Sequence, residues 1–292
     1  MQRTIHDLRR AALTLGCFGL LTAAWCGSRA SAQDSKVTPA GQRIFYTGHS
    51  FHMFIPGRID QLAKSAGIET HKTAGTQGIG GSRVIQHWDL ADDKNKAKPA
   101  LQTGQVDVFT MAAHLQIPDP GIDKLTELGL KYNPDLRLLV QASWMPYDQT
   151  SPQQRIKDNT ERNNTKLDDL QTATNAWRKS MEAQVDDLNK QHGRRAVFIV
   201  PVGDAVNKVR EQIVAGKFPS VARQSDLFRD AIGHGLGHVQ AMTAYCHFAA
   251  IYRRTPEGLT LNEQGVSDEQ HTILQRIAWE TVAGYSHSGV PK

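Results

Sequence analysis

GQRIFYTGHSFHMFIPGRIDQLAKSAG, residues 41–67, passes from a short apolar run directly into a helix-like pattern. A strand followed at once by a helix is the first half of a βαβ unit. The apolar run ends in Gly48-His49-Ser50, and ligands of open α/β sheets bind beyond the carboxyl ends of strands. Because Gly-X-Ser is also common by chance, the function of Ser50 depends on which residues accompany it.

The rest of the chain continues this alternation of apolar runs and helical patterns. Runs that are apolar without strict alternation predict strands buried on both faces. We expect strands at 42–48, 68–74, 106–112, 136–143 and 196–203, and helices at 53–66, 119–132, 160–191, 204–215, 237–253 and 268–285. The pattern predicts an α/β fold, a three-layer α/β/α sandwich of the flavodoxin-like kind with about five parallel strands. The polar segment 160–193 is expected to form a solvent-facing helix.

The first 32 residues have the three parts of a secretory signal peptide. An apolar stretch at 11–25 follows a positively charged start that contains Arg3, Arg9 and Arg10. The small residues Ala30-Ser31-Ala32 predict cleavage before Gln33, which leaves one domain at 33–292. The apolar stretch is shorter than the roughly 20 residues of a membrane span. We therefore expect export to the periplasm or the exterior, without stable membrane insertion.

Charge and cysteine content narrow the function further. Removing the signal takes away four Arg and one Asp, which lowers the net charge from +5 to +2. Such a balanced chain gives no reason to expect nucleic-acid binding, which requires a concentrated basic face. Cys17 and Cys26 leave with the signal, so Cys246 remains alone and the exported chain must fold without an internal disulfide.

Three side chains supply the parts of a serine nucleophile and its activating groups. A serine hydroxyl needs a base within hydrogen-bond reach, and that base is oriented by a carboxylate. Ser50 follows the first expected strand, and late in the chain Asp230 precedes His234 by four positions. A glycine-rich loop after the second expected strand brings Gly80 and Gly81, whose backbone N–H groups can approach an oxyanion together with that of Ser50.

Taken together, these motifs resemble the SGNH (GDSL-like) hydrolases, in particular an exported bacterial branch. The resemblance rests on Gly48-His49-Ser50, on GIGGSRVIQHWD at 78–89, and on the late sequence from DLFRD at 226–230 to RRTPEG at 253–258. It implies that Ser50 is the nucleophile, Gly80 or Gly81 an oxyanion donor, Asp230 the orienting carboxylate and His234 the general base.

Two departures from the family pattern leave alternatives open. The block after the third strand reads MAAH and lacks the family's Asn, so His114 is a substitute for the missing oxyanion donor. The late block is Asp-X-X-X-His, one residue longer than Asp-X-X-His, so His238 is an alternative base. These departures also favour a second hypothesis, a binding protein that kept the fold and lost catalysis.

A metal-dependent hydrolase is a third hypothesis. His234 and His238 are spaced as two ligands on one helix face, and His247 or a carboxylate could complete the site. Against it, Gly235 and Gly237 weaken a helix there, and the Glu of a His-Glu-X-X-His motif is absent.

The first hypothesis is the one that we favour from the sequence. We expect an exported, cofactor-free serine hydrolase that cleaves an ester of a small molecule or glycan, such as a small acyl group on a carbohydrate. The simpler interpretations are a Ser50 hydroxyl that caps the following helix and glycines that serve only a tight turn.

Overall fold

The computed structural model describes residues 38–291, and the expected signal peptide lies outside this range. The core of the described chain is one five-stranded parallel sheet with the strand order β2-β1-β3-β4-β5. Its strands are β1 (Arg43–Gly48), β2 (Lys72–Gly78), β3 (Val108–Ala112), β4 (Arg137–Gln141) and β5 (Val197–Val200). The expected α/β fold with five parallel strands is confirmed.

Four strands lie within their predicted ranges, and β2 lies a few residues later in the chain than predicted. Every residue of β3 and β5 is buried, as helices on both faces require. The edge strand β2 is polar and alternates between exposed and half-buried residues, so it gives little apolar signal. Its predicted start at 68 was wrong because Ile68 still belongs to the turn that follows the preceding helix, where its N–H donates to the Ala63 carbonyl at 2.9 Å.

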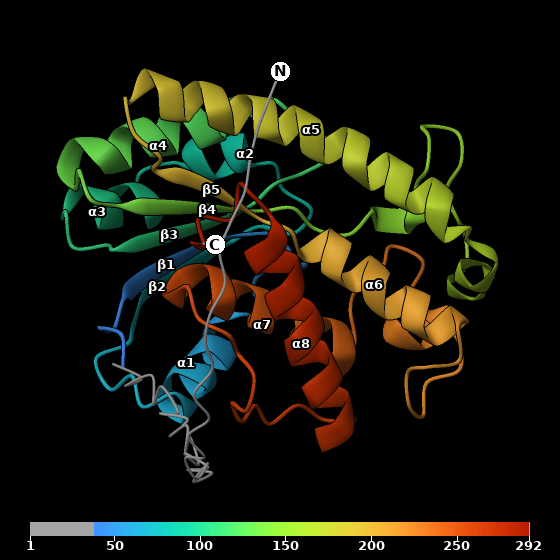
Figure 1. The fold of residues 1–292 in the computed structure, drawn as a ribbon. Coiled ribbons are helices and arrows are strands. Elements are labelled where there is room, and N and C mark those ends of the chain that lie inside the picture. The colour runs from blue at the N-terminus through green and yellow to red at the C-terminus, as the bar shows by residue number, and fades with distance from the viewer. Residues whose placement is uncertain (1–37, 292) are drawn as a thin grey trace, which may run out of the picture. The chain divides into compact units, whose positions relative to one another are not determined.

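Helices form the two outer layers (Figure 1). One face of the sheet is covered by α1 (Pro56–Ser65), α6 (Val202–Val214), α7 (Gly237–Tyr252) and α8 (Asp268–Gly284). The other face is covered by α2 (Val84–Trp88), α3 (Ala97–Gln102), α4 (Pro120–Tyr132) and α5 (Leu167–Gln191). The short helices α2 and α3 were not predicted, and the expected helix at 160–191 divides into a 3₁₀ segment, Asn159–Asn164, and α5.

Helix α7 lies at the centre of its layer, between the sheet and α8. Nearly all of its side chains from Val239 onward are buried, which agrees with a sequence that is apolar on every side. None of the helices within residues 38–291 combines the length and the apolar character that crossing a membrane requires.

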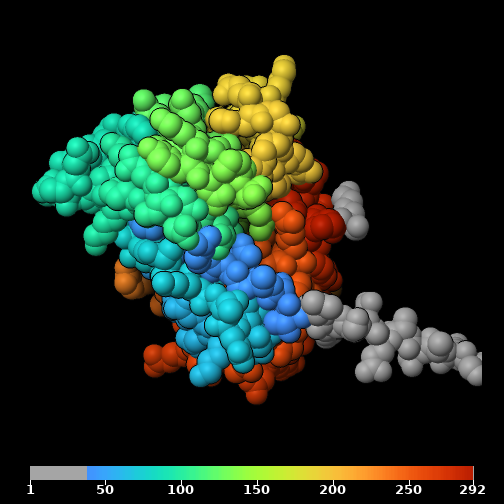
Figure 2. Space-filling view, turned by 90° about the vertical axis from the view of Figure 1, so that its left-hand side faces the viewer, coloured from blue at the N-terminus to red at the C-terminus, as the bar shows by residue number. Residues whose placement is uncertain are grey.

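The two ends of the described chain meet beside this layer. Arg58 of α1 donates to both carboxylate oxygens of Glu263, at 2.5 and 2.8 Å. The N–H of Thr260 donates to the Ser65 hydroxyl at 2.7 Å. Figure 2 shows the blue N-terminal part of the described chain beside the orange and red C-terminal part. Residues from the start and the end of the domain can therefore share one site.

The strand order also locates a crevice. The chain leaves β1 for β2 on one side and returns to β3 on the other. At such a switch point the connections diverge to opposite faces and leave a crevice beyond the carboxyl ends of the strands, where ligands of doubly wound sheets bind.

Candidate active site

Ser50 stands in a tight turn directly after β1. The His49 carbonyl accepts hydrogen bonds from the N–H groups of His52 and Met53, at 3.0 and 3.1 Å. A Cβ at Gly48 would lie 2.7 Å from the Ala112 side chain, so the strand end requires glycine. Helix α1 begins only at Pro56 and has no side-chain cap, so Ser50 does not cap it. The turn leaves Ser50 exposed beyond the carboxyl end of β1.

His49 fixes this turn while remaining neutral. Its Nδ1 accepts from the Phe51 N–H at 3.2 Å, and its Nε2–H donates to the Ala113 carbonyl at 3.3 Å. Burial lowers the pKa of His49 to about 4. Both ring nitrogens are therefore occupied in holding the turn, and neither is available as a base.

The structure brings Ser50, His234 and Asp230 together in a hydrogen-bonded chain. His234 Nε2 lies 3.0 Å from Ser50 Oγ, and His234 Nδ1 lies 2.7 Å from Asp230 Oδ2. With the proton on Nδ1 donated to the carboxylate, Nε2 is free to accept the serine proton. This is the connectivity of a nucleophile, a base and an orienting carboxylate.

The longer Asp-X-X-X-His spacing is accommodated by a turn built around the Asp230 carboxylate. Asp230 Oδ1 accepts from the N–H groups of Gly233 and His234, at 3.0 and 3.1 Å. Burial raises the pKa of Asp230, but the hydrogen bonds from His234 and Gly233 outweigh it and hold the pKa below its ordinary value. The carboxylate is thus ionised near neutral pH and available to orient His234.

His238 does not join this group. His234 lies in the loop before α7, whereas His238 lies in its first turn, so the two do not share a helix face. The His238 ring packs edge-on against Phe218 at 5.7 Å, and its Nε2 is buried without a hydrogen-bond partner. Within residues 38–291, no group of three or more His, Cys, Asp or Glu side chains is placed to hold a metal ion.

Two possible oxyanion donors lie on the other side of Ser50. Gly81 adopts a positive φ of 62° and lines a cavity together with Ser50, whereas Gly80 is not among the residues that line this cavity. Among the hydrogen bonds of residues 38–291, none uses the N–H of Ser50 or Gly81 as a donor. Both N–H groups can therefore donate to a bound oxygen.

His114 lies on the wall of the same cavity, after β3. Its Nδ1 is buried and has no hydrogen-bond partner. Burial, followed by the nearby charge of Arg83, lowers the pKa of His114, which keeps the ring neutral at neutral pH. A neutral imidazole has one N–H to donate, so the ring supplies the kind of group that the missing Asn would have supplied.

The cavity beside Ser50 has a volume of about 370 Å³, and Phe51, Trp144, Tyr147 and Trp177 are among the residues that line it. Trp144 stacks on Phe51 with ring centroids 4.5 Å apart, and its indole N–H donates to the Gly233 carbonyl at 2.8 Å. The indole N–H of Trp177 likewise donates to the His114 carbonyl at 3.3 Å. Both tryptophans therefore turn apolar faces, not donors, toward the cavity.

These cavity walls were not predicted from the sequence. Trp144 and Tyr147 directly follow β4, in a stretch that reads SWMPYD at 143–148. Aromatic residues at the carboxyl end of a strand were a usable signal, because ligands gather at that edge. Trp177 gives no such signal, because it lies within the long polar segment expected to face solvent.

A buried polar network supports the turn of Ser50 from behind. Gln141 at the end of β4 donates to the Phe51 carbonyl at 2.9 Å and to the Ser143 hydroxyl at 2.7 Å. Its Oε1 accepts from His52 at 2.8 Å and from His247 at 2.9 Å. Burial lowers the pKa of His52 to about 3, so the network is uncharged. It fixes the position of the turn relative to β4.

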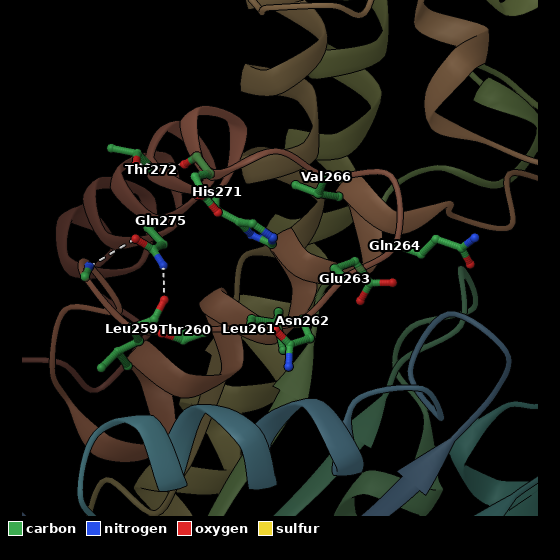
Figure 3. Close-up of a pocket in the computed structure, with 12 residues that line it drawn as sticks. Leu259, Thr260, Leu261, Asn262, Glu263, Gln264, Val266, His271, Thr272 and Gln275 are labelled. Atoms are coloured by element: carbon green, nitrogen blue, oxygen red, sulfur yellow. Dashed lines mark hydrogen bonds between the residues drawn. The ribbon is translucent and has the colours of Figure 1, made fainter.

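A second hollow, of about 530 Å³, lies between the loop 258–266 and α8 (Figure 3). Three of its polar side chains, Glu263, His271 and Gln275, already have partners. Glu263 is paired with Arg58, and His271 Nδ1 is hydrogen-bonded to the Tyr245 hydroxyl at 2.8 Å. Gln275 bonds to the Gly258 N–H and the Leu259 carbonyl. Although larger, this hollow lacks Ser50 and its partners, so the cavity beside Ser50 is the stronger candidate.

Fold and site together define a doubly wound α/β protein with a Ser–His–Asp arrangement at the switch point of its sheet. No family model and no curated protein matches the sequence. Among solved structures, a DUF4886 family protein from Bacteroides uniformis has a TM-score of 0.55 at 15% identity, covering 86% of this chain and 97% of that protein. This likeness shows a shared fold.

Two further structures have lower scores. A protein from Slackia heliotrinireducens, described as a candidate SGNH hydrolase, has a TM-score of 0.35 at 16% identity, covering 56% of this chain and 80% of that one. A phospholipase A1 from Streptomyces albidoflavus has a TM-score of 0.43 at 10% identity, and the match covers 73% of this chain and 100% of that protein.

Proposed function

We propose that this protein is an exported serine hydrolase that cleaves carboxylic esters. The observation that carries the proposal is the hydrogen-bonded chain from Ser50 Oγ through His234 to Asp230, with distances of 3.0 and 2.7 Å. This is the order of nucleophile, base and orienting carboxylate that acyl transfer by a serine requires. Export is proposed from the N-terminal sequence alone.

The reaction follows from the atoms in place. His234 Nε2 takes the proton of Ser50 as its Oγ attacks the ester carbonyl, and Asp230 stabilises the resulting imidazolium. The N–H groups of Ser50 and Gly81 donate to the oxyanion, and His114 adds a side-chain donor. His234 then protonates the departing alcohol. Water, deprotonated by His234, attacks the acyl-enzyme and restores Ser50.

The cavity favours an ester whose acyl part is larger than acetyl and apolar. About 370 Å³ corresponds to roughly twelve water molecules at ~30 Å³ each, far more than a two-carbon group fills. The indole N–H groups of Trp144 and Trp177 are already bonded within the protein, so polar contacts to a ligand come instead from lining residues such as Tyr147, Gln149 and Arg155. The small acyl group that the sequence favours fills only a small part of this cavity.

The decisive experiment compares residues 33–292 with the variant Ser50→Ala. We expect the unmodified protein to react with a fluorophosphonate and to hydrolyse p-nitrophenyl esters, with kcat/KM higher for butyrate and hexanoate than for acetate. Both activities should vanish in Ser50→Ala. His234→Ala should lose about as much kcat as Ser50→Ala, because a triad acts as one unit. His238→Ala should not.

Two results would contradict the proposal. Labelling that persists in Ser50→Ala would place the reactive group elsewhere. A protein that neither labels nor turns over would favour the binding-protein hypothesis instead. A preference for acetate over the longer esters would refute the assignment of the cavity to the acyl group while leaving the serine mechanism intact.

A further inference from the structure

The loop between Asp230 and His234 is held by its backbone carbonyls. Four consecutive carbonyl oxygens each accept a hydrogen bond from outside the loop. Arg162 Nη2 donates to the carbonyls of Asp230 and Ala231, at 3.2 and 3.0 Å. The Tyr147 N–H donates to the Ile232 carbonyl at 3.0 Å, and Trp144 donates to that of Gly233. The position of the base thus depends on groups that do not touch Ser50.

Arg162 belongs to a buried ion cluster. Asp148 accepts hydrogen bonds from Arg162 on one side and from Arg210 on the other. The two bonds from Arg210 are 3.0 and 2.5 Å long. The side chains of all three residues are at most 1% exposed. Two guanidinium groups share one carboxylate, so one positive charge is left over. Buried charge needs polar partners, and the carbonyls of the loop supply them.

The same cluster holds the wall of the cavity. Tyr147 and Asp148 both adopt a positive φ, of 56° and 43°, which is rare for residues other than glycine. The Asp148 carboxylate pairs with both arginines, so the ion cluster maintains this unusual turn. The turn places Tyr147 against the cavity and its N–H against the Ile232 carbonyl. One assembly therefore fixes both the cavity wall and the base.

From these contacts we infer that Arg162 is a positioning residue for the Asp230–His234 pair. It acts through the carbonyls of the loop, and Asp148 aims its guanidinium at them. The inference rests on the proposed function for its kinetic consequences, but the geometry that it concerns can be measured without catalysis. Arg210 offers a matched control, because it shares Asp148 and the same burial but donates to no carbonyl of the loop.

The experiment compares Arg162→Met with Arg210→Met in the protein spanning residues 33–292. Each variant loses one buried cation, so a purely structural role predicts similar effects. We expect Arg162→Met to lower kcat for p-nitrophenyl butyrate by about 10- to 100-fold, with KM changed less than about threefold, since a misplaced base slows the chemical step. Arg210→Met removes two hydrogen bonds to Asp148 but leaves the Arg162 donations to the loop in place, so it should lower kcat by at least about fivefold less than Arg162→Met. Arg162→Lys should recover part of the loss.

A second readout does not depend on activity. The Nδ1–H proton of His234, donated to Asp230, should give a far-downfield NMR resonance that disappears in Asp230→Asn. We expect this resonance in the unmodified protein and in Arg210→Met, and its loss in Arg162→Met. If either methionine variant does not fold, Arg162→Lys and Arg210→Lys are compared by the same measurements.

Equal effects of the two substitutions, or an unchanged resonance in Arg162→Met, would overturn the inference. Failure of the proposed function has a different signature. In that case the unmodified protein shows no Ser50-dependent activity, and the NMR comparison alone decides whether Arg162 positions His234.

Discussion

We expect the free energy of unfolding to fall in acid, because three buried histidines take up protons only when the protein unfolds. His49, His52 and His87 are each at most 7% exposed. Burial lowers their pKa values to about 4, 3 and 4, against an ordinary value of 6.5. In the unfolded chain they take up protons as the pH falls below 6.5, while in the folded protein they stay neutral. Stability is therefore complete well above pH 6.5 and is lost as the pH falls toward the folded pKa values.

The size of the loss follows from 1.36 kcal/mol for each unit of pKa difference. At pH 5 each histidine is about 1.5 units below its unfolded pKa, which costs about 2 kcal/mol. Three histidines cost about 6 kcal/mol, comparable with the roughly 5–15 kcal/mol by which a domain is stable. Between pH 6 and pH 5 the free energy of unfolding should fall by about 3–4 kcal/mol.

Urea unfolding followed by tryptophan fluorescence at pH 8, 7, 6 and 5 measures this dependence. We expect nearly equal values at pH 8 and 7 and the steepest fall between 6 and 5. The variant His52→Gln removes one titrating group, so its fall over that interval should be smaller by about 1.2 kcal/mol. A fall of less than about 1 kcal/mol in the unmodified protein would show that these rings do not stay neutral in the fold.

Two further outcomes are expected. Asp148→Asn leaves Arg162 and Arg210 buried without a carboxylate, which should cost about 3–5 kcal/mol in urea unfolding, whereas Asp226→Asn, from an exposed pair with Arg223, should cost less than about 1 kcal/mol. Burial raises the pKa of the Cys246 thiol, so a thiol reagent should modify it only at the rate of unfolding; rapid modification of the native protein would contradict this placement.

The sheet could be predicted from sequence because strands that are buried on both faces consist mostly of apolar residues. Strands such as β3 and β5 are continuous apolar runs, so their existence and type followed from composition alone. The edge strand β2 has a polar sequence, and nothing local fixed where it begins. Short helices such as α2 carry too few residues for a periodic pattern, so only the tertiary structure reveals them.

The parts of the candidate site were predictable in kind, since Ser, His and Asp are residue types that supply a nucleophile, a base and an orienting carboxylate. The residues that hold these side chains in position were not predictable. Arg162 lies in a segment whose polarity predicted exposure, yet its side chain is fully buried. A charged residue is buried only when partners satisfy it, and no local pattern pairs Arg162 with Asp148, 14 positions earlier in the chain. Choosing His234 over His238 likewise required the loop geometry.

Ser50 and His234 are separated by 184 positions along the chain, yet their side chains meet. A chain that has folded only its first strands has the serine but no base, and a chain lacking α7 and the loop before it has neither base nor carboxylate. Hydrolysis in a refolding mixture would therefore report completed tertiary structure rather than secondary structure. If the proposed function holds, activity would lag behind the helical signal wherever the C-terminal layer docks last.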